Sequence, residues 1–148
     1  MIAIGAVAGH NKAYAADYIT CQADGTDQRD DSAVLQSYLD MARDNGSVKV
    51  KIPAGTYYIK DALTIYSNTE LLLDKNAKIV RTDGANVMLK GFQDFKIPGY
   101  GQIHDVTVDG GIWDGDANDS TSLSPLMYFC HGQKVTLKNL TQIGRAHV

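Results

Sequence analysis

One helix is predicted near the start of the chain, where apolar residues follow a helical spacing. These residues are Leu35, Tyr38, Leu39 and Ala42, which form a single apolar face. Asp30-Asp31-Ser32 offers capping oxygens and negative charge at the start of this face, and Asn45-Gly46 offers a left-handed residue at its end. The pattern therefore predicts a helix over residues 31–45.

After this helix, apolar residues alternate with polar ones in short runs that favour strands. The predicted strands lie at 48–52, 57–59, 63–65, 71–73, 106–108, 112–113, 126–129 and 135–137. Single Asn, Asp or Gly residues separate the runs, in place of the two-residue loops that hairpins use. A sandwich built from hairpins is the main structural alternative, and the turn residues argue against it.

Three of the predicted segments resemble one another and suggest a repeat. They are residues 69–74, 105–110 and 134–139. Val106 and Val135 are 29 residues apart, which is typical of a solenoid. Thr69 and Val106 are 37 residues apart, so an insertion is expected at about 91–101. A parallel β-helix is predicted, with the early helix covering its first rung and Asn139 at an asparagine corner.

Both ends of the chain differ from this pattern. Residues 1–15 are predicted to be a secretory signal remnant, because the apolar run Ile2–Gly9 precedes the small-x-small site Ala13-Tyr14-Ala15. The run is shorter than the ~20 residues of a membrane span, and a buried first strand is the alternative interpretation. A secreted protein without a membrane span is therefore expected.

Residues 143–148 are predicted to be a sequencing-adapter scar. One frame of a common short-read adapter encodes Ile-Gly-Arg-Ala-His-Val, and its next codon is a stop. Native sequence is then expected to end at Thr141, with the Gln142 codon completed by the adapter. Residues 16–142 would form the N-terminal cap and first rungs of a longer protein, which is expected to be a monomer when complete.

Composition and charge exclude several classes of partner. The chain is 44% hydrophobic and 21% charged, as expected for a globular protein. Its net charge is −3, and it lacks the clustered Lys and Arg of a nucleic-acid or anionic-membrane surface. Recognition of an acidic polymer would therefore have to be local. The two cysteines, Cys21 and Cys130, are expected to be free thiols that act as small apolar side chains.

Several motifs resemble those of the pectate-lyase-like and polygalacturonase-like proteins. Residues 24–36 are similar to the family's GDG-x-TDD opening, and residues 52–57 to its IPAGTY motif. Residues 63–79 continue the likeness, and residues 108–115 resemble the rung motif I-DG-G-x-I-DG. The resemblance covers about residues 19–141 and implies an all-β fold, a right-handed parallel β-helix with a capping α-helix.

The resemblance implies a secreted enzyme that degrades a pectic or other acidic polysaccharide. A pectin or polygalacturonan glycoside hydrolase would use paired Asp residues as general acid and base. That branch's Asn-x-Asp, Gly-His-Gly and Arg-x-Lys motifs do not occur here, and capping explains Asp30-Asp31. No catalytic residue is therefore assigned, and this fragment is expected to be inactive. A pectate lyase, the one case that would require calcium as a cofactor, and a non-catalytic glycan-binding adhesin or spike remain alternatives.

The richest polar cluster contains Asp109, Asp114, Asp116, Asn118 and Asp119. The start of a calcium loop is matched at Asp114-x-Asp116-x-Asn118, but position six is not Gly and position twelve is not Glu. A solvated loop at a rung corner is favoured, and no metal site is predicted.

The candidate substrate-binding residues are Asp114, Asp116 and His131. Trp113 could be a platform for a sugar ring, but packing in the interior is favoured for a Trp within an apolar alternation.

Overall fold

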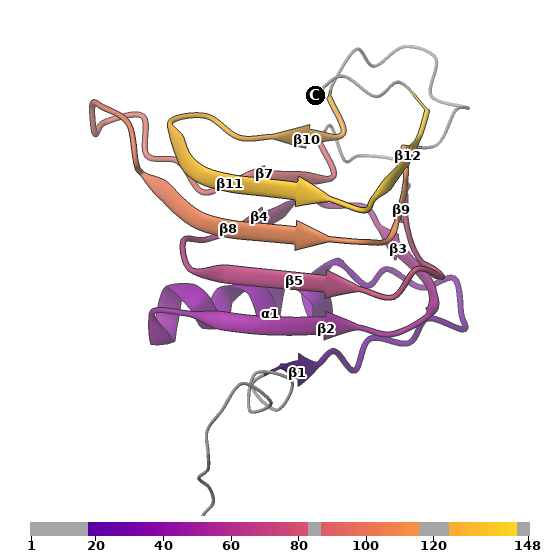
Figure 1. The fold of residues 1–148 in the computed structure, drawn as a ribbon. Coiled ribbons are helices and arrows are strands. Elements are labelled where there is room, and N and C mark those ends of the chain that lie inside the picture. Colours follow the sequence, from indigo (N-terminus) through magenta and orange to yellow (C-terminus); the bar gives the residue numbers. More distant parts are fainter. Residues whose placement is uncertain (1–17, 83–86, 116–124, 145–148) are drawn as a thin grey trace, which may run out of the picture.

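Successive turns of the chain contribute strands to parallel sheets that stack along one axis (Figure 1). The computed structural model describes residues 18–82, 87–115 and 125–144. Sheet A has the order β1 (Ile19–Thr20), β2 (Val48–Ile52), β5 (Thr69–Leu73), β8 (Ile103–Asp109), β11 (Gly132–Lys138). Sheet B has the order β3 (Gly55–Ile59), β6 (Ala77–Arg81), β9 (Ile112–Asp114), β12 (Thr141–Ile143). Sheet C has the order β4 (Leu63–Ile65), β7 (Leu89–Gly91), β10 (Met127–Tyr128).

The register of sheet A confirms the predicted repeat. Val106 pairs with Val135, and Thr69 pairs with Val106. Residues separated by each of the two predicted spacings therefore lie side by side in neighbouring rungs. The longer second rung contains residues 92–102 between β7 and β8, where the insertion was expected. We call these residues the insertion loop.

Left-handed residues occur both at the corners of the solenoid and within two strands of sheet A. Asn68, with a φ of 61°, directly precedes β5. Asp105 and Lys134, with φ values of 54° and 53°, lie within β8 and β11, directly before the paired residues Val106 and Val135. Asn139 has a φ of 57°, which confirms the predicted asparagine corner. Its amide donates a hydrogen bond of 2.9 Å to the carboxylate of Asp109 in the neighbouring rung.

The interior of the solenoid is filled by the apolar side of each strand. The alternation predicted for 48–52 is observed, with Val48, Val50 and Ile52 buried. Trp113 is fully buried, and its indole N–H donates to the Gly110 carbonyl at 3.3 Å. The predicted interior position of Trp113 is therefore confirmed, and Trp113 is not available as a sugar platform.

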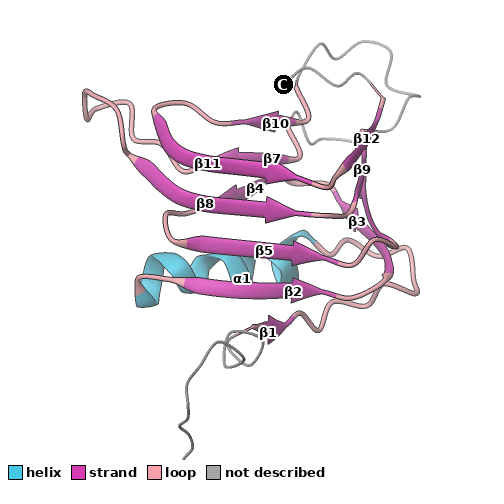
Figure 2. Cartoon of the chain, viewed as in Figure 1, coloured by secondary structure: helices cyan, strands magenta, loops and turns pink. Residues whose placement is uncertain are grey.

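Helix α1 (Ser32–Asn45) covers the N-terminal end of the solenoid, beside β2 and β4 (Figure 2). Leu35 and Leu39 are buried against the core, and Gly46 ends the helix in the left-handed conformation with its N–H bonded to Ala42. The predicted cap is thus observed, and the end of the β-helix interior is not left open to water.

The capping role predicted for Asp31 is wrong in one respect. Its carboxylate makes no hydrogen bond to the helix and instead accepts the backbone N–H of Tyr58 in β3 at 3.0 Å. Asp30 is the carboxylate that accepts the Ser32 N–H, at 3.1 Å, and it also accepts the Lys60 N–H at 3.2 Å. The two acidic residues therefore join the start of the helix to the first rung.

Candidate functional site

An open groove of about 500 Å³ lies on the outer face of sheet C. Thr64, Lys90 and Tyr128 occupy paired positions in β4, β7 and β10, so their side chains form one outward column. This follows from the alternation of strands, because the residues on either side of Thr64 are buried. The groove is lined by Thr64, Tyr66, Lys90, Gly91, Phe92, Gln93, Phe95 and Tyr128.

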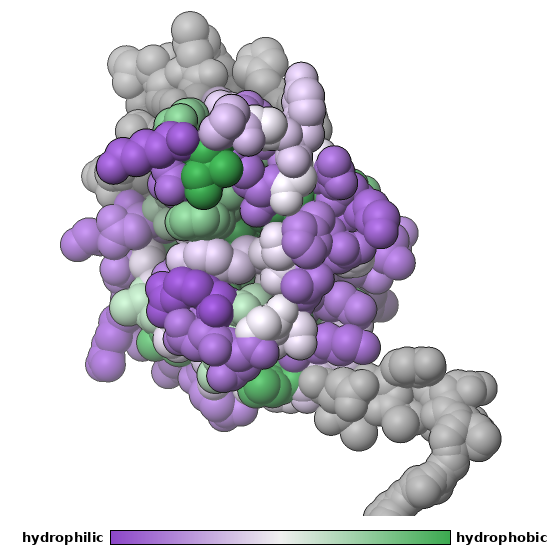
Figure 3. Space-filling view, turned by 90° about the vertical axis from the view of Figure 1, so that its left-hand side faces the viewer, coloured by the Kyte–Doolittle hydropathy of each residue, from purple (hydrophilic) through white to green (hydrophobic). Residues whose placement is uncertain are grey.

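Aromatic side chains make up much of this lining. Tyr66 and Phe92 stack with their ring centroids 5.3 Å apart and their planes 29° apart. Phe95 is 83% exposed, and Phe92 and Tyr128 are 45% and 41% exposed. Figure 3 views the side that carries the insertion loop, where hydrophobic residues interrupt a mainly hydrophilic surface. Exposed apolar groups gathered in one patch are typical of a binding surface.

The insertion loop that carries Phe95 is cross-linked by the amide of Gln102. This amide accepts the Asp94 N–H at 2.9 Å and donates to the Ile97 carbonyl. The base of the loop is tied to the next rung, because the Gly101 N–H donates to the His131 carbonyl at 2.7 Å. The loop is therefore held at a fixed place beside the groove.

His131, a predicted substrate-binding residue, lies at the corner between β10 and β11 with a φ of 54°. Its ring lies 5.7 Å from that of Tyr100, centroid to centroid, and its Nδ1 is 3.4 Å from the amide nitrogen of Gln102. These contacts place His131 against the insertion loop. It is not among the residues that line the groove.

Asp114, the second predicted residue, lies in β9 of sheet B and not in a solvated loop. Its carboxylate forms an ion pair of 2.8 Å with Lys78, and its side chain is only 17% exposed. Because it faces outward from sheet B, the structure does not bring it together with His131 or with the groove. Asp116 lies outside the described residues.

Lys90 supplies the positive charge of the groove. It is exposed and lies at the middle of the outward column. Lys49, Lys78 and Lys138 pair with carboxylates on the other two sheets. Among the described residues, no carboxylate pairs with Lys90. An anionic group of a ligand would therefore meet an uncompensated charge there.

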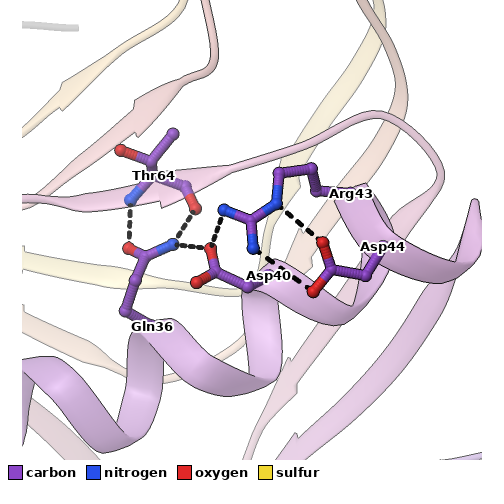
Figure 4. A network of polar contacts seen from close by, with 5 residues as sticks. All are labelled: Gln36, Asp40, Arg43, Asp44 and Thr64. Carbon is purple, nitrogen blue, oxygen red and sulfur yellow. Dashed lines mark hydrogen bonds and ion pairs between the residues drawn. The ribbon is translucent and has the colours of Figure 1, made fainter.

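The cap helix reaches the groove through a network of polar side chains (Figure 4). Arg43 forms a two-pronged hydrogen bond with Asp44, at 2.8 and 3.2 Å, and lies 3.5 Å from Asp40. The hydrogen bond from Arg43 lowers the pKa of Asp44, so both groups stay charged. The Arg43 guanidinium also lies 5.6 Å from the centroid of the Tyr66 ring.

A second groove, of about 480 Å³, lies between the end of the helix and sheet A. Its charged side chains already have partners within the chain. Glu70 accepts a hydrogen bond of 2.7 Å from the Tyr18 hydroxyl. This hydrogen bond, with a smaller contribution from burial, raises the pKa of Tyr18 to about 12. Asp105 lies 2.9 Å from His104 and 3.6 Å from Lys134. The charges of this groove are thus neutralised internally, in contrast to Lys90.

Sequence reasoning missed the groove residues Tyr66, Lys90 and Phe92. The sequence did contain one indication of this groove, the insertion expected at about 91–101, because a long loop beside short rungs often carries function. Within the described part of the chain, no group of three His, Cys, Asp or Glu side chains is arranged to hold a metal. Cys21 is buried, which raises the pKa of its thiol, and Cys130 is half-buried.

Comparison with solved structures identifies the fold. Two structures of PfbA, a surface adhesin of Streptococcus pneumoniae, match with 23% and 24% identity and TM-scores of 0.63 and 0.65. They cover 84% and 85% of this chain and 32% and 35% of PfbA. The A-module of the mannuronan C-5 epimerase AlgE4 from Azotobacter vinelandii matches with 21% identity and a TM-score of 0.63, over 85% of this chain and 38% of the module.

These likenesses confirm the predicted fold, a right-handed parallel β-helix. The chain spans about a third of the length of these structures. The sequence matches no protein-family model and no curated protein. None of the described residues form a helix that is both long and apolar enough to cross a membrane.

Proposed function

We propose that this chain binds a polysaccharide along the groove of sheet C, as part of a secreted β-helix protein that acts on such polymers. The observation that carries the proposal is the stack of the partly buried Tyr66 on the exposed Phe92, with Phe95 and Tyr128 beside it in the groove. Aromatic rings offer large, rigid apolar faces, on which the C–H faces of sugar rings pack. Since the groove crosses successive strands of sheet C, it suits an extended chain of sugars.

The proposed ligand is an acidic polysaccharide of the pectic type. Lys90 supports this choice, because an exposed ammonium that pairs with no carboxylate in the described part of the chain can pair with the carboxylate of a uronic acid. The net charge of −3 gives no long-range attraction for such a polymer, so recognition depends on this local cation. The AlgE4 module, which shares the fold, is named for an enzyme of mannuronan.

The activity proposed for the whole protein is that of a pectic glycoside hydrolase, on the basis of the sequence motifs given above. A non-catalytic glycan-binding protein is the second candidate, and one observation favours it. The described lining of the groove contains no carboxylate, whereas a hydrolase would require two beside the scissile bond. PfbA, with the same fold, is named as an adhesin.

Electrophoresis of the chain in gels that contain polygalacturonate tests the proposal. Retardation of the wild-type chain is expected, with a large loss of retardation in the Phe92→Ala and Tyr66→Ala variants. Tyr58→Ala is the matched control, since Tyr58 faces outward from sheet B. Equal migration of the wild-type chain with and without polygalacturonate would contradict the proposal, and so would an equal loss in the control.

A further inference from the structure

We propose that Arg43 of the cap helix is a positioning residue for the groove, which holds the Tyr66 ring in the orientation that stacks on Phe92. The inference rests on the proposed function and deepens it, because it makes the cap a part of the binding site. The observations that carry it are the contacts of Arg43 with Asp44, Asp40 and the Tyr66 ring.

Tyr66 lies at the edge of sheet C, partly buried against the core of the solenoid. It directly follows β4, a strand of three residues at the edge of sheet C. On one side Phe92 of the next rung supports the ring, but no further strand of sheet C lies beyond β4 within the described residues. The neighbour on that side is helix α1, which contacts β4 and places Arg43 next to the ring.

Arg43 is suited to this task because its guanidinium is planar and is itself fixed. The two-pronged hydrogen bond with Asp44 sets the plane of the group, and Asp40 adds a third contact. A guanidinium within about 6 Å of an aromatic centroid attracts the ring through its quadrupole. At 5.6 Å, Arg43 meets this criterion for Tyr66.

The same geometry argues that Arg43 acts through Tyr66 and does not bind an acidic sugar itself. Two carboxylates from its own helix already surround its charge. It is not among the residues that line the groove, whereas Tyr66 and Lys90 are. Lys90 is thus assigned to anion recognition, and Arg43 to orientation of the ring.

A double-mutant cycle on the full chain tests this assignment, with a polygalacturonate oligomer as the ligand. Arg43→Met keeps the aliphatic stem and is expected to lower affinity about three- to fivefold, the range of one exposed cation–π contact. Arg43→Lys is expected to lower it as well, since an ammonium cannot make the two-pronged contact. Arg29→Met is the matched control, because Arg29 also pairs with a nearby Asp but lies outside the groove.

The cycle separates a positioning role from direct binding. Adding Arg43→Met to the Tyr66→Ala variant is expected to cause no further loss, because the ring through which Arg43 acts is gone. Additive losses would overturn the assignment, and so would full retention of affinity in Arg43→Met.

A ligand-free measurement keeps this inference distinct from the proposed function. Arg43→Met is expected to shift the aromatic proton resonances of Tyr66 and Phe92, which Arg29→Met leaves in place. If the wild-type chain binds no polygalacturonate, the proposed function fails, and these resonances still decide whether Arg43 positions the ring. Unchanged resonances in Arg43→Met would overturn the inference even if the groove binds the polymer.

Discussion

The side chain of Gln36 makes both hydrogen bonds to Thr64 that a neighbouring strand would make. Its amide nitrogen donates to the Thr64 carbonyl at 2.9 Å, and its amide oxygen accepts the Thr64 N–H at 2.8 Å (Figure 4). Because β4 is the last strand of sheet C at this end among residues 18–82, 87–115 and 125–144, these bonds satisfy backbone groups at the edge of the sheet. One glutamine of the cap thus completes the edge of the sheet that carries the groove.

We expect Gln36→Leu to lower the free energy of unfolding by about 1–3 kcal/mol, the usual cost of leaving partly buried polar groups unpaired. Denaturation in urea, followed by circular dichroism, measures the change. Gln22→Leu is the control, since Gln22 makes one exposed hydrogen bond to Thr20. A Gln36→Leu variant as stable as the control would show that water replaces the side chain without cost.

Asp30 and Asp31 are expected to affect stability with opposite signs. Burial raises the pKa of Asp31, so its contribution to stability is present at low pH and is lost as the pH rises through the folded pKa. Asn keeps an acceptor for the Tyr58 N–H but carries no charge. Asp31→Asn is therefore expected to raise the free energy of unfolding at pH 7, by up to about 1 kcal/mol, and to lose this advantage near pH 3.

Burial also acts on Asp30, but hydrogen bonds from Ser32 and Lys60 outweigh it and lower the pKa. Its contribution is therefore present above the unfolded pKa and is lost as the pH falls through the folded pKa. Asp30→Ala is expected to cost about 1–2 kcal/mol at pH 7 and less near pH 3. Urea denaturation at both pH values measures the two variants. Changes of the same sign at pH 7 would contradict this account.

Gly110 is expected to tolerate no side chain. Its φ is 90°, and a Cβ there would lie 2.4 Å from the carbonyl oxygen of Leu73 in the rung below. Gly110→Ala should lower the free energy of unfolding by more than about 2 kcal/mol, because strain and a backbone clash add. Gly99→Ala isolates the clash, since Gly99 has a φ of 104° with open space around it, and should cost about 1 kcal/mol. If thermal unfolding shows the same loss of stability in both variants, contact with Leu73 in the neighbouring rung does not restrict Gly110.

Lys90→Ala is expected to weaken binding of a polygalacturonate oligomer by about tenfold, or ~1.4 kcal/mol, through loss of the ion pair. Binding of a neutral oligosaccharide of equal length should change little. Isothermal titration calorimetry measures both, and Lys51→Ala, an exposed lysine of sheet A, is the control. An equal loss for the acidic and the neutral ligand would contradict the role of charge.

Much of the fold is predictable because the rungs of a solenoid stack, so that similar segments recur at a spacing visible in the sequence. The distances from Thr69 to Val106 and from Val106 to Val135 are those of paired residues in sheet A. Four strands were missed for physical reasons. Both residues of β1 are exposed, and β7 has Gly91 at one of its two inward positions, so neither shows an apolar alternation. In β6, Arg81 at an inward position breaks the alternation, and β12 ends at Ile143, in the segment predicted to be a scar.

The groove was not predictable in the same way. Tyr66, Lys90 and Phe92 come from two different rungs and become neighbours only through the register of sheet C. Polar candidates were chosen by residue type within a short stretch, and this selected Asp114, whose charge is already paired with Lys78. A contact between an arginine of the cap and a tyrosine of the first rung leaves no local pattern in the sequence.

Titration of the ¹⁵N- and ¹³C-labelled chain with a polygalacturonate oligomer, followed by NMR, tests the proposed groove most directly. We predict that resonance changes concentrate at Tyr66, Lys90, Phe92 and Phe95, and that the outer faces of sheets A and B stay unchanged. Changes centred on sheet A or on Asp114 of sheet B would contradict the account, as would the absence of any change at millimolar oligomer.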